Sequence, residues 1–246
     1  MTLVESVALK VESLHLGFPG RRVLQDFSLQ LKRDEILGLI GKVGSGKTQL
    51  LRAIAGLSEP QSGSVWLGSP GERQVGYVFQ EDNLIPWLTI RETLKLCRRS
   101  DRSVTLGSIE ESWLALKPAQ LSGGMRQRVN LARGFMNHDQ VVLMDEPFSA
   151  LDPGERRALQ IDFLKLQSQV KNSVIFVTHD LPEALLLCHR LVFLSKKTGR
   201  IECSRENPFQ GNFGGILGNA EVLSDPSYQS LLKTFAQLFE SPVPKQ

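Results

Sequence analysis

One octapeptide, GKVGSGKT at positions 41–48, constrains this chain more than any other segment. Two glycines with four residues between them are followed by lysine and threonine, which is the spacing of a loop that binds phosphate. The glycines let successive backbone N–H groups turn toward phosphate oxygens, and the N-terminus of a following helix adds a favourable dipole. The predicted phosphate-binding residues are Gly41, Lys42, Val43, Gly44, Ser45, Gly46, Lys47 and Thr48. The ammonium of Lys47 can reach the β- and γ-phosphates, and the hydroxyl of Thr48 can bind Mg²⁺.

The segments on either side of this loop have the strand and helix patterns that the motif requires. The run EILGLIG before it is nearly all apolar, as in a buried strand of a parallel sheet, and TQLLRAIAGL after it has a helical pattern. The runs VVLMD and SVIFVTH are two further buried strands, with a helix predicted between them from Pro153 to about Val170, and LVFLS is another strand. Shorter strands are predicted at 7–16, 23–31, 64–67 and 75–79. This order favours an α/β domain.

Two acidic residues end the strand VVLMD, where ligands bind in open α/β sheets. Asp145 can hold Mg²⁺ through water, and Glu146, whose side chain points differently, can act as a general base on an attacking water. The alternative is that VVLMD is an ordinary strand followed by a surface acid without a catalytic role. The phosphate loop upstream disfavours this alternative. His179 ends the next buried strand, so we expect it to sense the γ-phosphate rather than to be structural.

Composition and charge exclude several functional classes. The 246 residues are 41% hydrophobic and 22% charged, which is ordinary for a globular protein. A net charge of +3 is too small to indicate nucleic acid or anionic lipid as a partner. No stretch of about 18 uncharged apolar residues occurs, so we expect no membrane span, no signal peptide and only a peripheral membrane role. Three cysteines without metal-ligand spacing predict buried thiols in a reducing compartment.

The segment LSGGMRQR, at 121–128, is the most specific marker in the chain. Paired glycines are poor helix formers and suit a loop that closely approaches a ligand. Together with the phosphate loop and the two acids, this segment resembles the signature motif of ATP-binding cassette (ABC) transporter subunits, and the resemblance extends from about Leu9 to Ser195. In that family two cassettes pair head to tail, which implies that Ser122, Gly123 and Gly124 contact the γ-phosphate of ATP bound to the other cassette.

The resemblance implies roles for further residues. Phe18 matches the aromatic residue that stacks on adenine, and Gln80 matches the glutamine that contacts Mg²⁺ and the attacking water. Glu146, His179, Gln80 and Lys47 would be catalytic, and Thr48, Gln80 and Asp145 would bind the metal. FSALD, at 148–152, resembles the loop that crosses the dimer interface. Asp34 departs from the family pattern, because a glycine is usual at this position, directly before Glu35.

The resemblance also implies an architecture and partners. We expect a P-loop NTPase with a RecA-like, mostly parallel core, an antiparallel β part and an inserted helical subdomain at about 85–137. The cassette would span 1–205, followed by a partly helical tail at 206–246. FQEDNLIPWLT, LSGGMRQR and MDEPFSALD are most similar to importers of the nitrate, sulfonate and taurine group. Partners would be a second copy or a paralogous cassette, a membrane permease docking near Leu84–Leu88 and, indirectly, a solute-binding protein. The chain would then work on the cytoplasmic face of the plasma membrane, without nucleic acid.

Other classes fit the sequence less well. A chromosome or DNA-repair ATPase would place a long coiled coil between the phosphate loop and LSGGMRQR. In this chain only about 70 residues separate the two motifs, and they contain no sustained heptads. A tandem-cassette translation factor would carry two sets of motifs, and a small-molecule kinase would lack LSGGMRQR. A non-hydrolysing module is disfavoured by Glu146 and His179. An exporter or a lipid-handling system remains the alternative to an importer, and LIPWL either binds the permease or packs the subdomain against the core.

Overall fold

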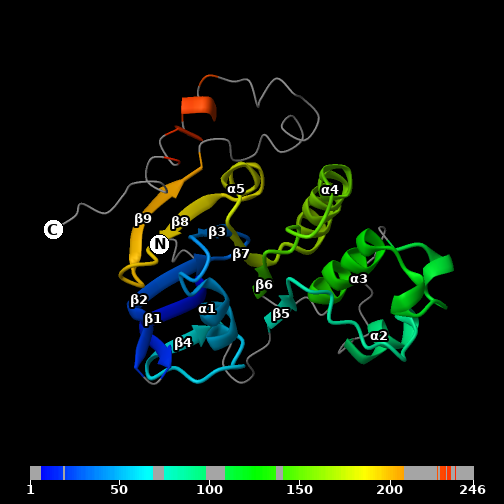
Figure 1. The fold of residues 1–246 in the computed structure, drawn as a ribbon, viewed down its shortest axis with the longest axis horizontal. Helices are drawn as coiled ribbons and strands as arrows, with labels where there is room; N and C mark the ends of the chain where they lie inside the picture. The colour runs from blue at the N-terminus through cyan, green and yellow to red at the C-terminus, as the bar shows by residue number, and fades with distance from the viewer. Residues whose placement is uncertain are drawn as a thin grey trace, which may run out of the picture.

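The computed structural model describes residues 7–18, 20–68, 75–97, 109–136 and 141–207, together with positions 226, 228–230, 232, 233 and 236. The larger sheet has six strands in the order β5-β6-β7-β3-β8-β9. These are β5 (Val75–Val78), β6 (Val141–Asp145), β7 (Ser173–Thr178), β3 (Ile36–Ile40), β8 (Arg190–Leu194) and β9 (Ile201–Glu206). All neighbours pair in parallel except β8 with β9. A smaller antiparallel sheet has the order β2-β1-β4, with β1 (Val7–Phe18), β2 (Arg21–Lys32) and β4 (Ser62–Leu67) (Figure 1).

Five α-helices between Lys47 and Leu187 have both ends within the described residues. They are α1 (Lys47–Ile54), α2 (Ile90–Cys97), α3 (Gly123–Phe135), α4 (Pro153–Val170) and α5 (Leu181–Leu187). Two short 3₁₀ helices, η1 (Glu111–Trp113) and η2 (Pro118–Gln120), lie between α2 and α3. In Figure 1, α2 and α3 stand on the opposite side of the molecule from the antiparallel sheet. The mostly parallel core, the antiparallel part and the helical part between β5 and β6 confirm the predicted fold class.

Both faces of the parallel sheet are covered, which explains why its strands are continuous apolar runs. Ile36 and Ile40 of β3 point into one cluster, where α3, α4 and α5 pack, while Leu37 and Leu39 point into a second cluster with α1 and the antiparallel sheet. A third cluster holds the helical part together and includes Leu84, Ile90, Leu94, Trp113, Leu121 and Val129. The elements that flank the phosphate loop are therefore fixed by packing on both sides.

Several local features differ from the sequence-based expectation. Gly123 and Gly124 form the first turn of α3 rather than a loop, because Ser122 is the N-cap and its hydroxyl accepts the N–H of Met125 at 3.2 Å. The seven-residue α5 and the mostly exposed edge strand β9 were not predicted, since neither has a strong periodic pattern. Asp34 has a φ of 61°, so the glycine usual at this position would suit the left-handed backbone better.

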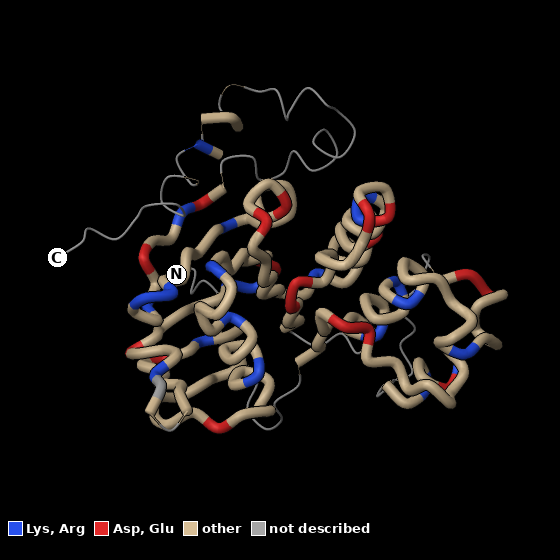
Figure 2. Tube along the Cα trace, in the orientation of Figure 1, with Lys and Arg blue, Asp and Glu red and all other residues tan. Residues whose placement is uncertain are grey.

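Parts of the predicted subdomain and tail lie outside the described residues, namely 98–108, 137–140 and most of the chain after Asn207. The described tail positions, from 226 to 236, are helical. No helix among the described residues is long and apolar enough to cross a membrane. In the described chain, Lys and Arg are scattered among Asp and Glu over many elements, and neither sign gathers on one of them (Figure 2).

Candidate active site

The phosphate loop joins the end of β3 to the start of α1, as the sequence predicted. Gly44 and Gly46 have φ values of 80° and 100°, which a side chain would strain. A Cβ on Gly46 would also lie 2.7 Å from Val23 Cγ1. No side chain caps the N-terminus of α1, whose N-cap is Gly46. The first N–H groups of α1 therefore have no capping side chain as a partner. Uncapped N–H groups at the start of a helix are the arrangement that binds phosphate in other proteins.

The Lys47 side chain is buried and folded back over its own loop. Its Nζ donates to the carbonyl of Gly41 at 2.7 Å and to that of Lys42 at 3.4 Å, and lies 3.8 Å from Glu146 Oε1. Burial lowers the pKa of Lys47, while the neighbouring carboxylates of Glu146 and Asp145 raise it. Gly41 and Lys42 thus hold the lysine in place through their carbonyl oxygens.

Thr48 and Asp145 bring two oxygen ligands together at the end of β6. The Thr48 hydroxyl donates to Asp145 Oδ1 at 3.1 Å, and the Tyr77 hydroxyl lies 3.5 Å from Asp145 Oδ2. Burial raises the pKa of Asp145, an effect larger than the opposing hydrogen bond from Thr48. Hydroxyl and carboxylate oxygens are hard ligands of the kind that Mg²⁺ prefers.

Glu146 and His179 meet although 33 residues separate them. His179 Nδ1 lies 3.0 Å from Glu146 Oε2. Glu146 has a φ of 45°, unusual for a residue other than glycine, and its N–H donates to the carbonyl of Val177 at 2.9 Å. Strained backbone of this kind is frequent at active sites. The turn directs the Glu146 carboxylate between the Lys47 ammonium and the His179 ring.

Gln80 follows β5 in a segment that α3 holds from the other side. Asn130 Nδ2 donates to the carbonyl of Phe79 at 2.9 Å, and Arg126 Nε donates to Asp82 Oδ2 at 2.8 Å. Arg133 donates to the carbonyls of Asn83 and Asp82 at 3.0 and 3.2 Å.

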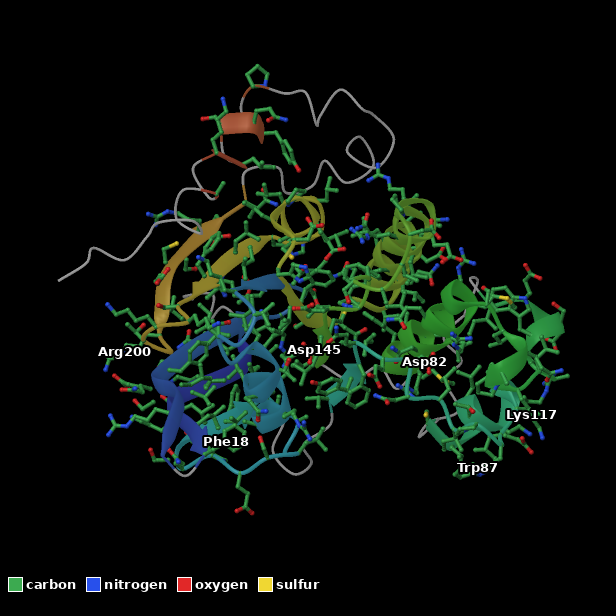
Figure 3. The ribbon with its side chains drawn as sticks, viewed as in Figure 1. Phe18, Asp82, Trp87, Lys117, Asp145 and Arg200 are labelled. Atoms are coloured by element: carbon green, nitrogen blue, oxygen red, sulfur yellow. The ribbon has the colours of Figure 1, made fainter. Side chains whose placement is uncertain are left out.

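Figure 3 shows Asp82 on the side of Asp145 that faces the helical part, with Trp87 further out. Helix α3 therefore fixes the loop that carries Gln80.

A cavity of about 470 Å³ brings most of the predicted residues together. Phe18, 54% exposed, forms one wall at the end of β1. The other lining residues are Arg22, Val23, Val43, Gly44, Ser45, Gly46, Lys47, Thr48, Gln49, Gln80, Glu146 and Lys196. Of these, Arg22, Val23, Gln49 and Lys196 were not predicted. Arg22, Val23 and Lys196 lie outside any motif, and only the fold brings them here; Gln49 is adjacent to the loop and could have been included.

Ser122, Gly123 and Gly124 of the signature motif are not among the described residues that line this cavity. Ser122 caps α3 and Gly123 is its first residue, and in the described part of the chain no atom beyond the adjacent residues and the helix backbone lies within 4 Å of where a Gly123 Cβ would be. Gly124 is different, because a Cβ there would lie 2.6 Å from Glu155 Oε1 of α4. Asp145 and His179 also stand outside the lining, but they contact the lining residues Thr48 and Glu146.

The residues present fit a nucleotide and its metal. Ser45 Oγ is buried in the cavity wall without a hydrogen-bond partner in the described chain, as expected where a ligand supplies the partner. No cluster of three or more His, Cys, Asp or Glu side chains that could hold a metal occurs in the described part of the chain. A Mg²⁺ bound by Thr48 and Asp145 would thus take its remaining ligands from phosphate and water.

This fold and this site define a P-loop NTPase. The family model for ABC transporters matches residues 24–149. The chain is 42% identical over 191 residues to the aliphatic sulfonates import ATP-binding protein SsuB 1 of Pseudomonas savastanoi pv. phaseolicola, covering 75% of this chain and 79% of that protein. It is 32% identical over 253 residues to the taurine import ATP-binding protein TauB of Escherichia coli O157:H7, covering 94% and 97%. The chain therefore belongs to the ATP-binding subunits of ABC transporters, and it resembles the sulfonate and taurine importer group, as predicted.

A solved structure agrees with this assignment. The dimeric ABC transporter cassette MJ0796 has a TM-score of 0.69 with 27% identity, covering 80% of this chain and 98% of that one. The same cassette in a post-hydrolysis state bound to ADP and Pi has a TM-score of 0.67. As a member of the ABC family, the chain is an ATP-binding, ATP-hydrolysing cassette.

Proposed function

We propose that this cassette powers uptake of a small anionic or organic solute through a separate permease, and that it hydrolyses ATP at two sites shared by a pair of cassettes. The relatives named for import of aliphatic sulfonates and of taurine support the direction of transport and the class of solute. Specificity for one solute would lie in the permease and the solute-binding protein.

Each chain would contribute one half of a site. The adenine would stack on Phe18, and the N–H groups of the phosphate loop with the Lys47 ammonium would bind the β- and γ-phosphates. Bound Mg²⁺, held by Thr48, Gln80 and Asp145, would neutralise phosphate charge. Glu146 would accept a proton from the attacking water, Gln80 would orient that water, and His179 would hold Glu146 and sense the γ-phosphate.

The partner cassette would contribute the other half. The observation that carries this proposal is that Lys47, Thr48, Gln80 and Glu146 line one cavity while the signature residues of the same chain stand apart from it. Ser122, Gly123 and Gly124 lie at the start of α3, where the first N–H groups of a helix have no intrahelical partner and suit a phosphate. ATP would close the pair because these contacts need the γ-phosphate, and hydrolysis would release them.

The surface near Trp87 supports docking of a permease. Leu84 is buried in the small cluster of the helical part, so the LIPWL segment is anchored there. Trp87 is 72% exposed, unusual for so large an apolar side chain. A cytoplasmic helix of the permease would cover it, which would place the cassette on the cytoplasmic face of the membrane as a peripheral subunit, with a solute-binding protein on the other side.

Sizing chromatography of Glu146→Gln with and without ATP tests the shared sites. This variant keeps the shape of the carboxylate but cannot accept the proton, so ATP should convert a monomer into a stable dimer. The double variant Glu146→Gln/Lys47→Ala, which loses the phosphate contact, is the matched control and should stay monomeric. A Glu146→Gln protein that binds ATP and remains monomeric would contradict the proposal.

Affinity purification of the chain from its native membrane tests import. A multi-span permease together with a solute-binding protein is expected in the mass spectrum. A permease recovered repeatedly with no binding protein would favour an exporter or a lipid-handling system instead.

A further inference from the structure

A buried carboxylate stands behind the Glu146–His179 pair and has no role in the site described so far. Glu183, in α5, is 6% exposed. Its Oε2 accepts the Thr178 hydroxyl at 2.8 Å, and its Oε1 accepts Gln160 Nε2 at 3.1 Å. Burial raises the pKa of Glu183, while these two hydrogen bonds lower it. A carboxylate is costly to bury, so its two specific partners indicate more than space filling.

The partners of Glu183 form the turn that carries His179. The hydroxyl of Thr178 also accepts the backbone N–H of Asp180 at 3.0 Å, so it bridges the residues on either side of the histidine. The N–H of Glu183 donates to Asp180 Oδ1 at 3.0 Å, which closes the turn onto the first residues of α5. Both backbone neighbours of His179 are thus held by one short network.

The same network connects this turn to α4, which follows the FSALD segment. Gln160 and Arg156 lie four residues apart and hence on one face of α4. Gln160 donates to Glu183, and Arg156 Nη1 lies 3.5 Å from Asp180 Oδ2. A small cavity of about 40 Å³ lies among these groups and is lined by Glu146, Phe148, Ser149, Arg156, Thr178, His179, Asp180 and Glu183. Glu183 therefore joins β7, α4 and α5 directly beneath the histidine.

We propose that Glu183 is a positioning residue for hydrolysis, which acts through Thr178 to hold the His179 ring against Glu146. Glu183 does not line the nucleotide cavity, and its hydrogen bonds run to Thr178, Gln160 and Asp180 rather than to Glu146, so we expect its effect on the rate to act through His179. This inference rests on the role of His179 in the proposed function. The variant Glu183→Ala would lower kcat about 10-fold with the KM for ATP unchanged, because the phosphate contacts of Lys47 are left intact.

A double-mutant cycle between Glu183 and His179 tests this proposal. Glu183→Ala in the His179→Ala background should cause no further loss of kcat, whereas losses that multiply would overturn the proposal. Glu183→Gln should recover most of the rate, since an amide oxygen still accepts the Thr178 hydroxyl. Glu202→Ala, an exposed acid on β9, is the matched control and should leave the rate unchanged.

Thr178 provides a second route if Glu183→Ala folds poorly. Thr178→Val keeps the shape of the side chain and removes the bridging hydroxyl, so it should reproduce the loss of kcat, and Thr178→Ser should restore it. Full activity in Thr178→Val would overturn the proposal. If His179→Ala itself retained the full rate, the proposed role of His179 would fail, and that outcome is distinct from losses that multiply.

Discussion

His179 Nδ1 lies 3.0 Å from Glu146 Oε2, and the same carboxylate has its other oxygen 3.8 Å from the Lys47 ammonium. The general base of the proposed reaction is thus held from two sides, by the first residue of α1 and by the residue that follows β7. This arrangement leads to predictions about catalysis, stability and partners.

His179→Ala should lower kcat about 100-fold, because the Glu146 carboxylate loses one of the two groups that orient it. The KM for ATP should change little, since the phosphate loop is intact. Steady-state phosphate release over a range of ATP concentrations separates the two parameters. An increase in KM with kcat unchanged would place His179 in ATP binding instead.

Asp145→Asn should raise the melting temperature of the nucleotide-free protein by about 2–4 °C and abolish Mg²⁺-dependent hydrolysis. The folded-state pKa of Asp145 is raised by burial, so its ionised form destabilises the fold above that pKa. The penalty disappears below the unfolded-state pKa of about 3.9, so the gain from the variant should shrink as the pH falls. Calorimetry of both proteins at neutral and acidic pH measures the difference in melting temperature. A melting temperature of Asp145→Asn below that of the wild type at neutral pH would contradict the prediction.

Asp34→Gly should stabilise the protein by about 0.5 kcal/mol, because glycine adopts the φ of 61° without steric cost. Asp34→Ala is the informative comparison. It should destabilise by about 1 kcal/mol, since a Cβ without a polar group disfavours this backbone. Chemical denaturation measures both, and ATP hydrolysis should be unchanged in each variant. Equal stabilities for the two variants would show that the backbone conformation at Asp34 does not limit stability.

Trp87→Ala should weaken binding to the permease about tenfold and leave hydrolysis by the isolated cassette unchanged, because the side chain is 72% exposed and outside the cavity. Trp66→Ala, on β4, removes another exposed tryptophan and should not affect binding. Co-purification with the permease in detergent measures both. Full binding by Trp87→Ala would move the docking surface elsewhere.

The sequence predicted the elements that carry a strong local signal. The phosphate loop, the buried strands and the helix at 153–170 were found because motif spacing and apolar runs are local properties. The contact between Glu146 and His179, the contribution of Arg22 and Lys196 to the cavity and the network around Glu183 were not found. They depend on the order of strands in the sheet, where β6, β7, β3 and β8 are neighbours although they are distant along the chain.

The most direct test of the shared site is the rate of ATP hydrolysis per molecule as the protein is diluted about a thousand-fold, for the wild type and for Ser122→Arg. A site completed by a second chain predicts that the rate per molecule falls on dilution, and that Ser122→Arg loses at least about 100-fold at every concentration. A rate per molecule that stays constant on dilution, together with full activity in Ser122→Arg, would contradict the account.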